Sequence, residues 1–402
     1  MTRNASIIVA GTGPAGLAAA LALSGAGFPV TLAGPEVRPD DRRTTALMAP
    51  SLAFLGTLGI AERLREEAAP LRTMRIVDAT SRLVRSPPVT FSATEIDEDS
   101  FGLNIPNRYL NRVLEEAVQQ APGIAWRRTT VAAWRLLPDR AVAALADGSE
   151  VEGLLVAAAD GRASPAREAA GIATRRTALP QSALVVNFAH TREHEWTSTE
   201  FHTETGPFTQ VPLPGGLRSS LVWVVGPDTA DELAALPDAA LSRRIEEKMQ
   251  SMLGKVTVEP GRQVYPLASV SPHGFAARRV ALVGEAAHVF PPIGAQGLNL
   301  GLRDVEDLAA VAVAHAADPG APTALAAYDR RRRADIMVRS GAVDLLNRSL
   351  LSSLLPAQLA RFAGLGALGA LPPLRGFFMR EGLRPGSGWS SLAGGLRKQV
   401  GR

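Results

Sequence analysis

The chain has 402 residues and a formal net charge of +4, and 46% of its residues are hydrophobic and 20% charged. This length and composition predict a globular protein with a large core and two domains. The absence of cysteine excludes disulfides, a thiolate nucleophile and a cysteine-bound metal.

The N-terminal residues predict no export signal. Their apolar run, Ile7–Ala10, is interrupted by glycines before a signal-peptide core is complete. Together with the lack of cysteine, this favours a cytoplasmic protein.

Residues 7–33 have the pattern of a βαβ unit. A buried strand at Ile7–Ala10 precedes an Ala/Leu-rich helix at Pro14–Ser24, and a second strand follows at Val30–Ala33. The first turn has the G-x-G-x-x-G spacing that lets a pyrophosphate approach the backbone at a helix N-terminus. The residues of this turn that we expect to bind a dinucleotide are Gly11, Gly13, Pro14, Ala15 and Gly16.

The acidic residue that usually binds the adenosine ribose is missing from its expected place. Gly34 follows the second strand, and Glu36 comes two residues later. Glu36 is the candidate for the ribose contact, with Asp40 and Asp41 as alternatives. The other interpretation is that all three are solvated loop acids.

A second candidate ligand-binding segment lies in the middle of the chain. A buried apolar strand at 154–159 ends in Asp160 and Gly161, and Arg167 follows in the first turn of a helix. Ligands of α/β sheets bind at the carboxyl ends of the strands. We therefore expect these three residues to contribute to the same dinucleotide site.

A third segment, GEAAHVFPPIGAQGLNLGLRD, begins at Gly284 after a buried strand at Val280–Val283 and leads into a helix at Leu298–Ala316. Gly294 and Gly297 allow the backbone to approach a planar ligand closely. Asn299 and Leu300 present amides at a helix N-terminus. The carboxyl ends of the three expected strands, at 7–10, 154–159 and 280–283, would thus meet at one crevice.

Residues 179–269 read as an inserted sheet. The predicted strands are Ala183–Ala189, Glu200–Thr205 and Ser219–Val225, with a helix at Asp238–Leu253. The apolar residues expected in its core or in a substrate pocket are Val211, Leu213, Leu221 and Trp223. The histidines of HTREHE, at 190–195, lie in this sheet pattern rather than on one helix, so we expect no metal site.

The C-terminal region is basic and apolar. From Tyr328 onward thirteen Lys and Arg oppose four Asp and Glu. Gln358 and Arg361 interrupt the apolar stretch and exclude a membrane-spanning helix. Two interpretations remain open: a segment lying on an anionic membrane surface, or a pair of helices packed on the core.

The glycine turn at 11–16, the segment from Asp160 to Arg167 and the segment from Gly284 to Asp304 together resemble the three fingerprints of FAD-dependent aromatic hydroxylases of the para-hydroxybenzoate hydroxylase type. Four further segments are similar to the ubiquinone-biosynthesis hydroxylases within that class. They are DRRTTALMAPSLAFLGTLGI (41–60), NIPNRYLNRVL (104–114), GPFTQVPLPGGLRSSLVWV (206–224) and PPLRGFFMREGL (372–383). The resemblance spans nearly the whole chain.

The resemblance implies roles for further residues. Arg43 would lie beside the flavin and its phosphates, and Asn107 would contact the cofactor. Glu285 replaces the family's usual Asp on the ribityl chain and is one methylene longer. The loop AHVFPPIGAQG, at 287–297, would lie against the flavin, and we call it the flavin loop. His288 would belong to this loop as a structural support rather than as an acid or base. The residues expected at the edge of the isoalloxazine ring are Pro291, Gly294, Gln296, Gly297, Asn299 and Leu300.

The resemblance also implies the reaction. NAD(P)H would reduce FAD, and O2 would form a C4a-hydroperoxyflavin that hydroxylates the ring of a polyprenylated phenol in ubiquinone biosynthesis. The alternatives are the same chemistry on a soluble aromatic metabolite, or a flavin-binding but non-catalytic subunit of a biosynthetic complex. Neither a metal nor a nucleic acid is expected.

The expected fold is α/β: a Rossmann-like FAD-binding domain, an inserted β-sheet substrate domain and a C-terminal helical segment. The expected ranges are 1–75, 98–178 and 270–330 for the FAD-binding domain, 76–97 and 179–269 for the sheet domain, and 331–402 for the C-terminal region. This last region would place a cytoplasmic protein on the inner face of the plasma membrane, with possible assembly with other ubiquinone-biosynthesis proteins.

Overall fold

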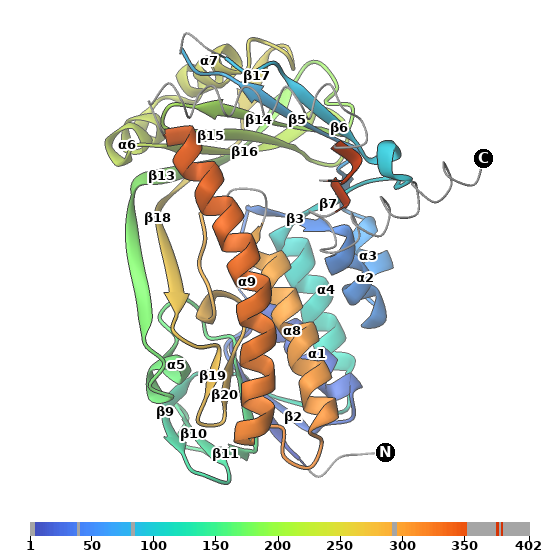
Figure 1. The fold of residues 1–402 in the computed structure, drawn as a ribbon. Helices are drawn as coiled ribbons and strands as arrows, with labels where there is room; N and C mark the ends of the chain where they lie inside the picture. The colour runs from blue at the N-terminus through green and yellow to red at the C-terminus, as the bar shows by residue number, and fades with distance from the viewer. Residues whose placement is uncertain are drawn as a thin grey trace, which may run out of the picture.

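A computed structural model describes residues 5–37, 41–81, 85–291, 296–351, 375–377 and 379–380. In Figure 1 a lower part, made of a parallel sheet and helices, lies beneath an upper β-sheet. Helix α9 (Pro322–Leu351) runs along the lower part and reaches strand β15 (Gly206–Pro212) of the upper sheet. The expected α/β fold is confirmed.

The centre of the lower part is a six-stranded sheet in the order β19-β20-β12-β1-β2-β8. Its strands are β1 (Ile7–Ala10), β2 (Val30–Ala33), β8 (Ile124–Arg127), β12 (Leu155–Ala158), β19 (Ala276–Ala277) and β20 (Val280–Leu282). All neighbours pair in parallel except β19 with β20. Every residue of β1 and β12 is buried, as expected for parallel strands covered on both faces.

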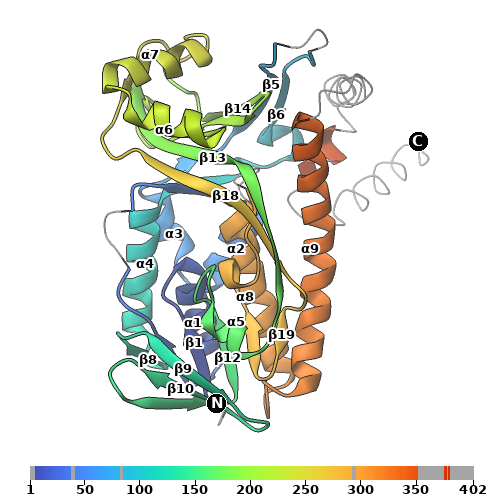
Figure 2. The same cartoon turned by 90° about the vertical axis from the view of Figure 1, so that its left-hand side faces the viewer.

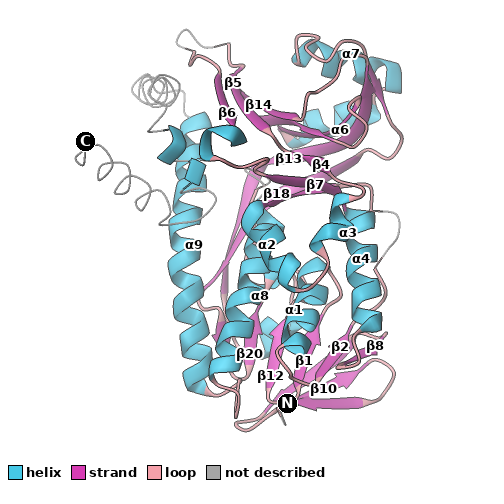
Figure 3. Ribbon diagram, turned by 90° about the vertical axis from the view of Figure 1, so that its right-hand side faces the viewer, coloured by secondary structure: helices cyan, strands magenta, loops and turns pink. Residues whose placement is uncertain are grey.

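Helices cover one face of this sheet (Figure 3). They are α1 (Pro14–Gly25), α4 (Asn107–Gln120), α8 (Gln296–Ala314) and α9. Pro14 occupies the first turn of α1, where its missing N–H costs no hydrogen bond. On the opposite side (Figure 2) lie helix α5 (Pro165–Ala169) and a small antiparallel sheet of β9 (Val131–Leu136), β10 (Ala141–Leu145) and β11 (Glu150–Gly153).

A second small sheet lies between the lower and upper parts. Its order is β3-β7-β4, and it consists of β3 (Thr44–Met48), β4 (Ala69–Pro70) and β7 (Gly102–Pro106). Helices α2 (Ala49–Thr57) and α3 (Ala61–Arg65) follow β3. The Asn104 side chain donates to the carbonyl of Pro212 at 2.8 Å and so ties this sheet to the upper one.

The upper sheet has the order β17-β13-β16-β15-β14-β5-β6, and β18 pairs with β13. Its other strands are β5 (Thr73–Asp78), β6 (Val89–Ser92), β13 (Thr174–His190), β14 (Thr197–Thr203), β16 (Arg218–Val225), β17 (Val256–Val258) and β18 (Gln263–Pro272). A short 3-10 helix, η1 (Ala93–Ile96), follows β6. Helices α6 (Pro227–Ala235) and α7 (Asp238–Lys248) pack on its outer face.

The outer face of this sheet holds a core of its own. Leu221 and Trp223 are buried in it, as expected, together with Leu184 and Phe188. Leu213 is buried as well, whereas Val211 is partly exposed. The alternation of buried and partly exposed residues along β13 and β15 is the period expected for strands with one face against a core.

The structure differs from the expected elements in several places, and three of these differences have a clear physical reason. Strand β13 begins at Thr174, because the chain continues extended from the lower part into the upper sheet and pairs there with β18. The expected boundary after residue 330 falls inside α9, because residues 323–340 contain neither Gly nor Pro. The sheet β9–β11 was not expected, since its alanines carry little strand signal.

Within the described ranges, no helix combines the length and apolarity needed to cross a bilayer.

Gly11 offers a test of the close packing in the β1–α1 turn. It has φ +105°, and a β-carbon there would collide with the backbone carbonyl of Ala159. Gly11→Ala should therefore lower the free energy of unfolding by about 2 kcal/mol or more, measured by chemical denaturation. Gly25→Ala, at the end of α1 with open space around it, should change it by less than about 1 kcal/mol. Equal effects of the two changes would contradict this account.

Candidate functional site

Three loops meet at the carboxyl ends of the neighbouring strands β20, β12 and β1. They follow Leu282, Ala158 and Ala10, respectively. Gly11 lies against the backbone of Ala159, and a β-carbon on Gly284 would come within 3.1 Å of that of Ala15. The structure thus brings together the three motifs that the sequence placed in one crevice.

The β1–α1 turn has the shape of an anion cradle. Gly13 is the N-cap of α1, and no atom lies within 4 Å of the position that its β-carbon would take. Gly16 and Gly11 pack backbone against backbone beneath the turn. There is therefore open space at the N-cap of α1, where a pyrophosphate could approach the helix N-terminus.

The candidates for ribose recognition are engaged with basic side chains. The Glu36 carboxylate accepts from Arg128 Nε at 2.7 Å, and both side chains are exposed. Asp41 forms a bidentate pair with Arg43 at 2.7 and 2.8 Å. Asp40 lies outside the described residues. Of these acids, Glu36 remains the predicted ribose contact, whereas both carboxylate oxygens of Asp41 accept from Arg43.

Asp160 has one satisfied and one unsatisfied carboxylate oxygen. Oδ2 accepts from the N–H of Ala166 at 3.0 Å, whereas Oδ1 is buried without a partner. Burial raises the pKa of Asp160, although hydrogen bonds from Ser164 and Ala166 oppose the shift. A buried carboxylate oxygen without a donor points to a ligand that supplies one.

Arg167 fixes two of the loops to each other. It is buried, and its guanidinium donates to the carbonyls of Ala286 and Arg162, both at 2.9 Å. The sequence placed Arg167 at the cofactor, but in the structure its guanidinium contacts the protein backbone. Arg167 thus joins the loops that carry Gly161 and Glu285, and its contact with a cofactor stays a prediction.

Glu285 faces the loop that follows β12. Its carboxylate accepts from Arg162 at 3.1 and 3.3 Å, and both side chains are about half exposed. Arg43 is near enough for Glu285 to contribute to a raised pKa of the Arg43 guanidinium, after the larger contribution of Asp41.

His288 belongs to a fully buried ionic network. Its Nε2 lies 2.8 Å from Asp304 Oδ2, which also accepts from the N–H of Gly284 at 2.9 Å. Asp304 Oδ1 accepts from Arg332 Nε at 2.7 Å. Arg332 is 1% exposed and also pairs with Asp307. His288 thus holds its loop to α8 through Asp304, and its place beside a flavin stays a prediction.

The asparagines predicted to touch the cofactor use their side chains within the protein. Asn299 accepts from the N–H of Met48 and from Ser51, and donates to the carbonyl of Ala46. Asn107 donates to Asp41 at 3.0 Å and accepts from Thr45. Asn299 therefore leaves only its backbone for the ring, and it joins α8 to β3.

The remaining predicted ring contacts are placed as follows. Pro291 and Leu300 are buried, and Gly297 is exposed at the start of α8. Gln296 begins α8, and its side chain is not described. Gly294 lies outside the described residues. Their contact with a flavin ring stays a prediction.

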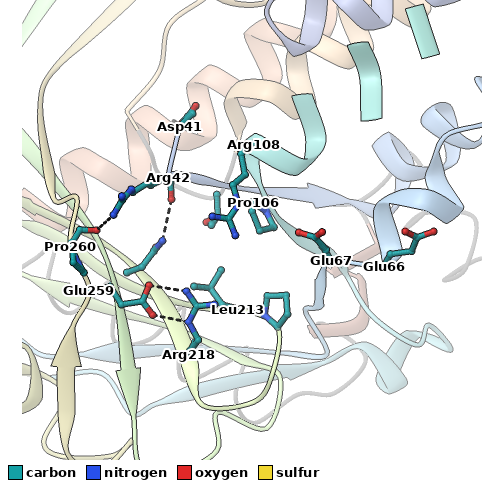
Figure 4. A pocket seen from close by; sticks show the side chains of 13 residues that line it. Asp41, Arg42, Glu66, Glu67, Pro106, Arg108, Leu213, Arg218, Glu259 and Pro260 are labelled. Atoms are coloured by element: carbon teal, nitrogen blue, oxygen red, sulfur yellow. Dashed lines mark hydrogen bonds and ion pairs between the residues drawn. The ribbon is translucent and has the colours of Figure 1, made fainter. Parts of the chain in front are cut away.

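A polar pocket of about 400 Å³ lies beside this crevice, between residues 41–44, the start of α4 and the upper sheet (Figure 4). Arg218 pairs with Glu259 at 2.7 and 2.8 Å across it. Asn187 donates to the carbonyl of Arg42 at 3.1 Å. Burial raises the pKa of neighbouring Asp41, but hydrogen bonds from Arg43 and Asn107 outweigh it and hold that pKa below its usual value.

Sequence reasoning missed Asp304, Arg332, Arg162 and the pocket residues of β13 and β16. Asp304 stood in the quoted GLNLGLRD segment without a role. A charged residue on the apolar side of a predicted helix was the available signal, because such a charge needs a buried partner. Nothing in the local pattern of the chain identifies Arg332 as that partner.

The histidines of HTREHE have protein partners. His190 contacts Arg192 O at 2.7 Å and Ser219 Oγ at 2.9 Å, and His194 contacts Leu213 O at 3.0 Å. Burial lowers the pKa of both. In the described part of the chain, no three His, Asp or Glu side chains gather as metal ligands would.

Comparison with known proteins gives consistent matches over most of the chain. A family model described as "FAD binding domain" matches residues 4–339. Ubiquinone hydroxylase UbiL of Rhodospirillum rubrum is 34% identical over 392 residues, 94% of this chain and 89% of that protein. The 3-demethoxyubiquinol 3-hydroxylase of Escherichia coli is 29% identical over 374 residues, 90% of this chain and 94% of that protein. Among solved structures, p-nitrophenol 4-monooxygenase PnpA of Pseudomonas putida has a TM-score of 0.74 at 22% identity, over 95% of this chain and 97% of that one.

Asp160→Asn should separate cofactor binding from fold stability. Asn keeps an acceptor for the N–H of Ala166 but removes the buried charge. Because burial raises the native pKa of Asp160, the ionised carboxylate destabilises the apoprotein above its unfolded pKa, and this cost is absent at lower pH. The variant should therefore be at least as stable as the wild type at neutral pH, with the difference shrinking on acidification, while FAD retention falls. Denaturation at several pH values and flavin absorbance measure these effects, and a less stable variant with full FAD content would contradict both.

Glu285→Ala should weaken FAD binding about tenfold, because it removes a carboxylate and releases Arg162 at the crevice. Glu150→Ala removes a similar exposed pair with Arg135 in the remote β9–β11 sheet and serves as the control. FAD titration of the apoprotein measures both. Unchanged affinity in Glu285→Ala would remove Glu285 from the site.

Proposed function

Because this chain belongs to the FAD-binding family of para-hydroxybenzoate hydroxylase-type monooxygenases, we propose that it hydroxylates the aromatic ring of a polyprenylated phenol in ubiquinone biosynthesis. The observation that carries the proposal is the similarity to ubiquinone hydroxylase UbiL over 94% of this chain and 89% of that protein. The same relation to the Escherichia coli hydroxylase supports it.

The described residues fit FAD. The open cradle at Gly13 and the α1 amides would hold its pyrophosphate, and Asp160 has a carboxylate oxygen for a donor of the cofactor. Glu285 and Arg43 would lie along its ribityl chain and phosphates. When bound, FAD accepts a hydride from NAD(P)H and transfers one oxygen atom from O2 to the ring.

The protein would contribute placement, electrostatics and exclusion of water. Backbone amides at the start of α8, near Gly297 and Asn299, would face negative charge on the reduced ring. The buried Pro291 and the network around His288 would keep the flavin loop in one conformation. The upper sheet would cover the substrate against the ring, as the sequence analysis expects for residues 179–269.

Reaction with defined phenols tests this proposal. Purified protein should contain FAD, oxidise NADH or NADPH faster when 2-farnesylphenol in detergent is added, and give a product heavier by one oxygen atom. Phenol without the prenyl chain should react far more slowly. Equal rates would favour the soluble aromatic alternative, for which the charged pocket of Figure 4 is the supporting observation. Protein without FAD would favour a non-catalytic subunit.

We further propose that the C-terminal region contacts an anionic membrane surface. Its support is the sequence: a net excess of basic residues after Tyr328 beside apolar stretches. Much of this region lies outside the described residues. The protein should co-sediment with anionic liposomes at low salt, and a chain ending at residue 351 should not. Equal binding by both chains would contradict the proposal, as would binding that salt does not weaken.

A further inference from the structure

We propose that Glu200, supported by His202, accepts the proton of the substrate's phenolic hydroxyl. This inference rests on the proposed function, in which the substrate is a phenol. An electrophilic oxygen attacks an electron-rich ring, and a phenolate ring is richer in electrons than a phenol. A base beside the hydroxyl group would therefore speed the hydroxylation step.

The location of Glu200 is the first argument. Outward residues of β13–β16 are buried against α6 and α7, whereas the opposite side of these strands is partly exposed. We call that side the inner face and define it by Asn187, Ser198, Glu200, Thr209, Val211 and Val222. Because the residues that define the inner face are partly exposed, this face is not packed against a second core.

The inner face is turned toward the predicted cofactor segment. Asn187 donates to the carbonyl of Arg42 at 3.1 Å. On the neighbouring strand β18, the ring of Tyr265 lies 5.6 Å from the guanidinium carbon of Arg43. A substrate held between the upper sheet and the flavin would therefore touch the inner face.

The geometry of the pair is the second argument. His202 Nε2 lies 2.8 Å from Glu200 Oε1, and the two side chains are 2% and 19% exposed. Thr209 Oγ1 is 3.4 Å from Glu200 Oε2, a weak contact that leaves this oxygen able to accept a stronger bond. The carboxylate is the accessible end of the pair, and the imidazole is its buried support. His202 Nδ1 is also buried and has no partner.

Other described ionisable groups of the upper sheet have interaction partners other than Glu200 and His202. Asp78 lies opposite His202 in the β5–β14 register, and its oxygens accept from Thr80 and from the N–H of Ser86. Arg218, at the start of β16, pairs with Glu259. Tyr265 bonds to Gln263. Among the described residues of the inner face, Glu200 is thus the carboxylate placed to meet a hydroxyl group.

The proposed step moves one proton. The hydroxyl O–H bond of the phenol breaks, its electron pair stays on the phenolate oxygen, and the proton binds Glu200 Oε2. His202 Nε2–H donates to Oε1 and holds the carboxylate in place. Because Glu200 is partly exposed, the proton can pass to solvent after the ring has been oxidised.

Glu200→Gln is the decisive variant, because it keeps the shape and the acceptor for His202 but cannot take up a proton. With 2-farnesylphenol at neutral pH, its hydroxylation rate should fall about 10²-fold, with FAD content unchanged. The wild-type rate should level off well below the phenol pKa of ~10, whereas the variant's rate should keep rising toward that pH. Ring-fluorinated farnesylphenol, which ionises without help, should recover most of the lost rate.

Glu150→Gln is the matched control, since it makes the same change of side chain in the remote β9–β11 sheet, where the Glu150 carboxylate pairs with Arg135. Its rate should stay within about twofold of the wild type. A wild-type rate and pH profile in Glu200→Gln would overturn the inference and leave the proposed function intact. A loss that fluorination does not recover would also overturn it, because it would make Glu200 only structural. A wild-type protein that holds FAD but adds no oxygen to farnesylphenol would overturn the proposed function itself.

Discussion

The buried carboxylate of Asp304 is the group on which the arrangement of the site depends. It accepts hydrogen bonds from the backbone of Gly284, from His288 and from Arg332, so one side chain joins the flavin loop, α8 and α9. A buried ion pair is tolerated only when its hydrogen bonds are satisfied, and removal of one partner leaves an uncompensated charge. The loop proposed to face the cofactor is therefore held in place by side chains of α8 and α9.

Short-range sequence patterns predicted the main elements of the fold. Glycine spacing and apolar runs located β1, α1 and β2, and alternation located β14, β16 and part of β13 in the upper sheet, because these signals depend on neighbours in sequence. The Asp304–Arg332 pair joins residues 28 positions apart and leaves no such pattern. The length of β13 depends on its pairing with β18, which is likewise a long-range property.

In the site, too, local patterns predicted some features and not others. They identified polar residues in the loops that follow β1, β12 and β20, but not which group each side chain contacts. Asn299, Asn107 and Arg167 use their side chains to join β3, Asp41 and the loop carbonyls, respectively. Side-chain direction is set by packing between segments distant in the chain, so spacing alone could not separate residues that touch a ligand from residues that hold the loops. Asp160 has a buried oxygen without a hydrogen-bond partner, and it is the residue that we propose to touch the ligand.

The connection between the two parts of the molecule limits how substrate can enter. The chain crosses to the upper sheet at β5 and β6 and again along β13 and β18, and this last pair of strands is hydrogen-bonded on the way. A hinge in such an antiparallel ribbon would have to break its ladder of hydrogen bonds, and α9 braces the same gap beside it. The ribbon and α9 therefore oppose opening of the upper sheet as an independent lid, and the prenylated phenol proposed as substrate would have to enter while the two parts stay joined.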